Sequence, residues 1–114
     1  MEAKALKKFI RSSPRKMRLV VDLIRGKNAA EAMALLKFST KLASRDIEMV
    51  LRSALSNLSN AQDGKSLNNE EVIVKRAYVD CGPMMKRIRP APMGRAYRVR
   101  KRSNHLTIVV STQD

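Results

Sequence analysis

Several kinds of residue are scarce in this chain of 114 residues. It contains one cysteine, no tryptophan, two phenylalanines and two tyrosines. A single cysteine excludes an internal disulfide and makes a reducing compartment, such as the cytoplasm, the default environment. The longest uninterrupted apolar run covers only residues 32–36. We therefore expect no membrane partner, because such a run cannot span a bilayer and the amino terminus has no apolar stretch typical of a signal peptide.

Residues that could carry catalysis or bind a metal are scarce as well. His105 is the only histidine, and neither it nor Cys81 has a neighbour in the sequence that would complete a pair of nucleophile and base. The chain has no glycine-rich phosphate loop and no spacing typical of metal ligands. The sequence therefore predicts no catalytic residue, no metal and no cofactor, and it indicates a binding protein rather than an enzyme.

Positive charge, by contrast, is abundant. The chain has 24 Lys and Arg residues against 10 Asp and Glu residues, a net charge of +14 and a pI of ≈ 10.8. Residues 1–27 carry nine basic and two acidic side chains, residues 28–81 carry seven of each, and residues 82–114 carry eight basic and one acidic. This excess favours a nucleic-acid partner over an anionic membrane surface. The two basic ends are expected to face that partner, and the neutral middle is expected to supply the core.

The most basic segment covers residues 82–102. It holds eight Lys and Arg residues, no acid, three prolines and two glycines, a composition that excludes a regular helix. The flanking residues 72–81 and 103–111 are rich in β-branched side chains and predict two antiparallel strands. We therefore expect a hairpin arm that reaches roughly 30 Å when extended at ~3.3 Å per residue. A bare arm of this kind would repel itself in water, whereas a phosphate backbone would neutralise it.

The rest of the chain predicts a small sheet that pairs at the base of the arm. Residues 2–10 alternate imperfectly and predict a short strand, with Leu6 and Ile10 on one side and Phe9 on the other. The strand at residues 103–111 has one apolar face, formed by Leu106, Ile108 and Val110. Three helices over one face of about three antiparallel strands are the economical arrangement. The predicted fold is α+β, with residues 1–114 as a single domain and residues 82–102 as its arm.

The first predicted helix has a basic outer side. Ser13 can cap it and Gly26 can end it. Its apolar face is formed by Met17, Val20, Val21 and Ile24. Arg15, Lys16 and Arg18 lie where the helix dipole is already positive, a placement that costs ~0.3–1 kcal/mol per exposed charge. A bound phosphate would turn this cost into a binding site. Solvated surface charge is the alternative interpretation.

Two further helices are predicted before residue 61. Asn28, with Glu31 at the capping-box spacing, can open the second helix, which runs to about Lys37. Thr40 can cap the third helix, whose apolar residues keep helical spacing over residues 43–61. Residues 62–66 have the composition of a surface loop.

The scarcity of aromatic residues narrows the kind of nucleic acid. Readers of single strands usually stack bases on aromatic platforms, and Tyr97 is the only aromatic residue in the arm. Arginine contacts to the phosphates of a structured RNA are therefore favoured. One alternative is an architectural DNA-binding protein that uses Pro90 and Pro92 as a wedge, although this leaves the basic first helix unexplained. A peptide acting at membranes would need a cationic amphipathic helix, whereas the most basic segment here is broken by proline.

Two long motifs resemble one known family. The first runs from Ser13-Pro14-Arg15-Lys16, through Arg18, to Ile24-Arg25-Gly26-Lys27. The second comprises Ala77-Tyr78-Val79-Asp80, Gly82-Pro83, Lys86-Arg87, Arg89-Pro90, Gly94-Arg95-Ala96 and Arg100-Lys101-Arg102-Ser103-Asn104-His105. Both resemble ribosomal large-subunit protein twenty-two of the bacterial type, and the resemblance covers nearly the whole chain in segment order and length.

The resemblance implies a structural protein of the large ribosomal subunit, located in the cytoplasm. It implies that the globular part binds large-subunit rRNA near the exit of the nascent-chain tunnel, and that the arm is threaded inward to line this tunnel. The implied partners are rRNA, neighbouring ribosomal proteins and the passing nascent polypeptide, and no homo-oligomer is required. The implied RNA-binding residues are Arg15, Lys16, Arg18, Arg25, Lys27, Lys86, Arg87, Arg89, Arg95, Arg98, Arg100, Lys101 and Arg102. The implied residues of the tunnel-lining tip are Ile88, Arg89, Pro90, Ala91, Pro92 and Met93.

Overall fold

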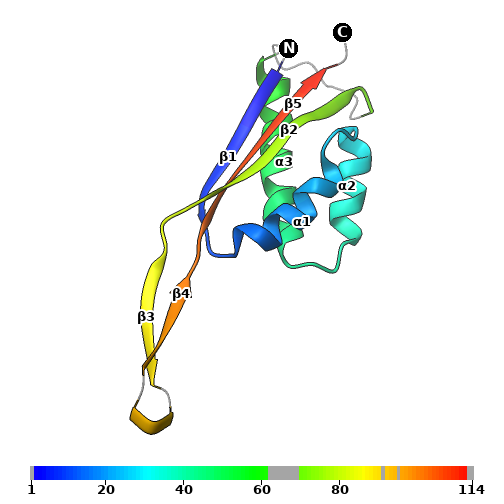
Figure 1. Cartoon of the computed structure of the whole chain (residues 1–114). Helices are drawn as coiled ribbons and strands as arrows, with labels where there is room; N and C mark the ends of the chain where they lie inside the picture. Colours follow the sequence, from blue (N-terminus) through cyan, green and yellow to red (C-terminus); the bar gives the residue numbers. More distant parts are fainter. Residues whose placement is uncertain (1, 62–69, 91, 95, 113–114) are drawn as a thin grey trace.

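The computed structural model describes residues 2–61, 70–90, 92–94 and 96–112. It contains a three-stranded antiparallel sheet with the strand order β1-β5-β2, three helices and a separate two-stranded hairpin (Figure 1). The strands of the sheet are β1 (Glu2–Ile10), β2 (Val72–Cys81) and β5 (Asn104–Thr112). The helices are α1 (Pro14–Ile24), α2 (Ala29–Phe38) and α3 (Ala43–Ala61). The α+β prediction is confirmed, whereas the loop predicted at residues 62–66 lies outside the described residues.

The hairpin projects from one end of the sheet. Its strands are β3 (Met85–Pro90) and β4 (Ala96–Lys101), and a short 3-10 turn, η1 (Pro92–Gly94), lies at its tip. β3 follows β2 after three residues, and β4 precedes β5 by two. The arm therefore prolongs the two neighbouring strands β2 and β5, and it makes the molecule 64 Å long against 25 and 17 Å in the other directions (Figure 1).

The core lies between the helices and one face of the sheet. On the central strand β5, Leu106, Ile108 and Val110 are fully buried, as the sequence predicts. The apolar face of α1 is buried against β2 and α3, and the longest helix, α3, packs across β1 and β5. All three helices lie on the same side of the sheet, so none of the described helices covers its other face (Figure 1).

The structure corrects the predicted faces of β1. Ile10 is 5% exposed and belongs to the core, whereas Leu6 is 50% exposed and lies on the uncovered face. The register between β1 and β5 shifts between Lys7 and Ile10, and Phe9 has a positive φ of 58°. A bulge of this kind inserts one extra residue and breaks the alternation of side chains. The prediction that Leu6 and Ile10 share a side was therefore wrong.

The helix ends agree with the predictions in part. Gly26 has a φ of 81° just after α1, a backbone conformation that glycine adopts readily. The Asn28 side chain accepts a hydrogen bond from the Glu31 N–H at 2.8 Å and caps α2, as predicted. The prediction for Thr40 was wrong, because α3 begins only at Ala43. A backbone turn leads into α3, with the Ser44 N–H donating to the Lys41 carbonyl.

Replacing Asn28 with alanine should lower the free energy of unfolding by about 1 kcal/mol, within a range of about 0.5–2, because the acceptor for the Glu31 amide is removed. Ser13→Ala is the matched control. Ser13 has the same position before α1, but its side chain makes no capping bond, so we expect a change under about 0.5 kcal/mol. Urea unfolding followed by circular dichroism measures both variants, and equal losses would contradict the role of Asn28.

Candidate nucleic-acid interface

The arm carries cations on both of its faces. In the register of β3 and β4, Lys86 lies opposite Arg100, and Met85 lies opposite Lys101. These three basic side chains, together with Arg87, are exposed. Successive residues of a strand point to opposite faces, so Lys86 and Arg87 lie on different sides of the hairpin. Residues 82–102 include no Asp or Glu, so no carboxylate within the arm can neutralise these charges.

This charge pattern opposes the formation of the hairpin on its own. Like charges directly opposite each other on neighbouring strands are destabilising, and the pair of Lys86 and Arg100 is such a case. A two-stranded hairpin without a sheet or helix beneath it is only marginally stable in water. Anions bound along both faces would therefore stabilise the arm in its extended form.

The tip of the arm exposes two large apolar side chains. Met93 is 95% exposed and Ile88 is 77% exposed. Met93 and Gly94 both have positive φ angles, of 65° and 73°, which turn the chain between β3 and β4. Among the other residues predicted in the arm, Arg89 and Arg98 are placed by backbone pairing opposite Tyr97 and Ile88. Arg102 lies just beyond β4 and is exposed, whereas Ala91 and Arg95 lie outside the described residues.

Hydrogen bonds connect the two sides of the hairpin at the base of the arm. The Gly82 N–H donates to the Ser103 carbonyl at 2.9 Å, and the Ser103 hydroxyl donates to the Pro83 carbonyl at 2.6 Å. A Cβ atom on Gly82 would lie 2.5 Å from the Ser103 Oγ, so a larger residue would displace that hydroxyl. The next residue, Asn104, is fully buried and donates from Nδ2 to the carbonyl and the hydroxyl of Ser12, at 2.9 and 2.8 Å. These bonds hold the base of the arm next to the start of α1.

Two of the predicted RNA-binding arginines also hold the edge of the sheet. Arg18 donates from Nη2 to the Val79 carbonyl at 3.0 Å, and Arg25 donates from Nη2 to the Ala77 carbonyl at 2.6 Å. These carbonyls belong to β2, which is an edge strand, and covering such an edge prevents further strands from adding to it. Both arginines remain exposed, but part of their donor capacity serves the fold.

The other predicted cations at α1 are exposed, and their side chains are more available to bind a phosphate than those of Arg18 and Arg25. Arg15 and Lys16 lie in the first turn of the helix, which contains no acidic residue. Lys27 follows the helix, and its carbonyl accepts from the Val74 N–H of β2 at 2.9 Å, whereas its side chain is free to face the solvent. The amides of the first turn and the charges of Arg15 and Lys16 therefore coincide at one end of α1.

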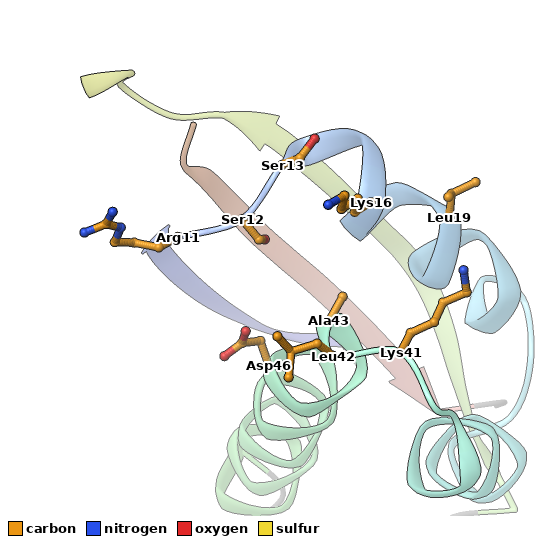
Figure 2. Close-up of a pocket in the computed structure, with 9 residues that line it drawn as sticks. All are labelled: Arg11, Ser12, Ser13, Lys16, Leu19, Lys41, Leu42, Ala43 and Asp46. Carbon is orange, nitrogen blue, oxygen red and sulfur yellow. The ribbon is translucent and has the colours of Figure 1, made fainter. Parts of the chain in front are cut away.

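A groove of ≈ 630 Å³ lies beside this first turn (Figure 2). It is lined by Arg11, Ser12, Ser13, Lys16, Leu19, Lys41, Leu42, Ala43 and Asp46. Figure 2 shows that its three cations come from separate segments: Lys16 from α1, Arg11 from the connection before α1, and Lys41 from the segment before α3. The carboxylate of the lining, Asp46, is bound to Lys7 at 2.9 Å. Arg11 and Lys41 were not among the predicted site residues, and the fold places both in the lining of the groove that Lys16 also lines.

No helix in the described part of the chain combines the length and apolarity needed to cross a membrane. Within the same ranges, no group of three or more His, Cys, Asp and Glu residues is arranged so that it could hold a metal ion.

Comparisons with known proteins agree on one family. The model of the family described as ribosomal protein L22p/L17e matches residues 5–111, which include the globular part and the arm. The chain is 56% identical over 110 residues to the large ribosomal subunit protein uL22 of Chlorobaculum tepidum, covering 96% of this chain and 92% of that protein. It is 55% identical over 111 residues to the protein of the same name from Staphylococcus aureus, covering 97% and 92%.

Proposed function

Because this chain belongs to the ribosomal protein L22p/L17e family, and is therefore a structural protein of the large subunit of the cytoplasmic ribosome rather than an enzyme, we propose that it binds large-subunit rRNA through its arm and the basic end of α1. The observation that carries this proposal is the arm itself. It is a hairpin with eight basic residues and no acidic one, and its exposed cations lie on both faces. The phosphates of RNA on both sides of the arm would neutralise these charges.

The two-sided charge pattern supports threading of the arm through folded RNA. A hairpin that lay flat on an RNA surface would need cations on one face only. With Lys86 and Arg87 on opposite faces, phosphates are bound on both sides at once, so RNA surrounds the arm. Guanidinium groups suit this task, because each can donate two parallel hydrogen bonds to one phosphate.

The tip has a different role in this proposal. Ile88, Arg89, Pro90, Ala91, Pro92 and Met93 form part of the wall of the nascent-chain exit tunnel, where the passing polypeptide touches them. The strong exposure of Met93 and Ile88 supports this role. Apolar side chains at the tip have little affinity for phosphate, so they border the tunnel without binding firmly to the RNA around it.

The globular end holds the protein at the subunit surface in the same proposal. Arg15, Lys16 and Lys27 bind phosphate, together with Arg11 and Lys41 of the groove. Arg18 joins them with the donors that β2 does not use, and Arg25 joins them although its Nη1 is also paired with Asp22 at 2.8 Å. Residues 1–114 then act as a single RNA-binding domain, and neighbouring ribosomal proteins contact the remaining surface.

The experiment compares binding to large-subunit rRNA fragments and to duplex DNA of equal length across a salt titration. The intact chain is compared with a shortened arm in which Asn-Gly replaces residues 87–99. The register leaves Lys86 and Arg100 paired at the new turn. We expect the intact chain to prefer rRNA, and the shortened chain to lose at least about 10²-fold in rRNA affinity at 0.1 M salt, because residues 87–99 include four arginines. Equal or tighter binding to DNA would overturn the proposal in favour of an architectural DNA-binding protein.

A further inference from the structure

The uncovered face of the sheet gathers aromatic side chains that are distant in the sequence. Phe9 of β1 is 63% exposed and Tyr78 of β2 is 44% exposed. His105 of β5 lies against Phe9 with the ring centroids 5.0 Å apart and the ring planes at 88°. The Phe9 N–H donates to the Nδ1 of His105 at 3.1 Å, which fixes the two residues relative to each other. Phe9 and Tyr78 are thus exposed, and His105 is partly exposed, on a face that the helices do not cover.

The strand register places cations beside these rings. Lys4 of β1 and Arg76 of β2 both lie opposite Val109 of the central strand, and both are exposed. Tyr78 lies opposite Thr107, two residues along the same strands. Two residues of a strand span about 7 Å. A row with two cations therefore runs next to a row with an aromatic ring.

We propose that this open face binds an unpaired segment of RNA, with one base stacked on Tyr78 and the adjoining phosphates bound by Lys4 and Arg76. The inference rests on the proposed function, since it assumes an RNA partner, but it adds a second contact surface and a different chemistry. An aromatic ring stacks on any base. Arg76 lies about 7 Å from Tyr78 along β2, and Lys4 lies one row along and two strands across, roughly 12 Å away, so both are near the sugar-phosphate backbone of a stacked nucleotide. The arm and α1 bind phosphates only, whereas this face also stacks on a base.

The acidic residues of this face do not oppose such a partner. Glu2 is bound to Lys75, and this hydrogen bond and the charge of Lys75 hold the pKa of Glu2 below its ordinary value of 4.5. Glu2 therefore stays ionised and paired at neutral pH, and the pair is lost only in acid. Asp80 lies opposite His105, one row beyond Tyr78 on the side away from Arg76. Arg76 thus lies on one side of Tyr78 and Asp80 on the other, so the phosphates of the proposed partner lie on the Arg76 side.

Tyrosine fluorescence tests the stacking directly. The chain has no tryptophan and only two tyrosines. In a full-length Tyr97→Phe variant, all of the tyrosine fluorescence therefore comes from Tyr78. The probes are a ten-nucleotide oligoadenylate, an abasic ribose-phosphate strand of the same length, and heparin. We expect oligoadenylate to quench Tyr78 and to bind about tenfold more tightly than the abasic strand. Quenching of equal strength by heparin would overturn the inference, because heparin has charge and no bases.

Variants on the same face give an independent readout. Tyr78→Phe should keep the preference for oligoadenylate over the abasic strand, and Tyr78→Leu should remove it, because leucine has no ring to stack. Phe38→Leu is the matched control, since Phe38 is 81% exposed on α2 and away from this face. Circular dichroism checks that each variant is folded. If Tyr78→Leu keeps the preference while rRNA binding by the intact chain is normal, the inference fails and the proposed function stands. If the intact chain shows no rRNA preference, the proposed function itself fails.

Discussion

Changing Lys86, Arg100 and Lys101 to glutamine should weaken rRNA binding by on the order of 10²-fold at 0.1 M salt and lower the salt slope by about 2. The reason is counterion release: each phosphate that a cation neutralises adds roughly 0.7–0.9 to the slope. All three side chains are exposed on the arm, and none has an acidic neighbour within residues 82–102. Fluorescence anisotropy across a salt titration measures the affinity and the slope together.

The control removes the same number of charges from another surface. Lys37, Arg45 and Arg52 are exposed on α2 and α3, so their change to glutamine lowers the net charge equally. If the arm binds the RNA, this control should alter the salt slope by less than about 1. The charges that it removes lie away from the bound RNA, and salt screens their long-range attraction to it. Equal losses from both triple variants would mean that total charge, rather than the arm, determines the binding.

Ile108→Ala should lower the free energy of unfolding by about 2–5 kcal/mol, which is a large part of the stability of a domain this small. Ile108 is fully buried on the central strand, and both of its partners in register, Ala5 of β1 and Ala77 of β2, are alanines. Such small neighbours cannot fill the cavity that the substitution leaves. Because β5 also carries the base of the arm, we expect the rRNA preference to fall with the fraction of folded protein.

Val109→Ala is the matched control for this substitution. Val109 is the next residue of β5 and lies on the uncovered face, where it is only partly buried. Val109→Ala should lower the free energy of unfolding by about 1 kcal/mol, because strand propensities vary over about that range. Urea unfolding measures both variants. A loss at Val109 as large as the loss at Ile108 would contradict the placement of the core on the helical side.

Local signals in the sequence predicted most of the fold. The glycine after α1 and the Asn28 cap of α2 depend on residues within one turn of each other, so the sequence alone identifies them. The composition of residues 82–102 likewise excluded a helix and left a hairpin as the remaining choice. Thr40 failed as a cap because a backbone turn leads into α3, and a turn of that kind has no single residue as its signature.

The remaining features depend on pairing between distant segments. The bulge at Phe9 appears only when β1 is aligned with β5, and it decides which side chains of β1 reach the core. Arg18 and Arg25 hold carbonyls more than fifty residues away, so no local pattern could separate their structural role from RNA binding. The same holds for Tyr78. The few aromatic residues argued against base stacking when counted along the chain, yet the sheet brings three rings onto one face.

The continuity of β2 with β3, and of β4 with β5, determines how tension on the tip would spread. A pull on the arm would enter the sheet along its strand axes, so rows of hydrogen bonds would be loaded together in shear instead of opening one after another. β5 is paired on both sides, and β2 is held along its outer edge by α1. The globular part thus acts as a mechanical anchor for the arm, and slippage of the arm would require several rows of bonds to break at once.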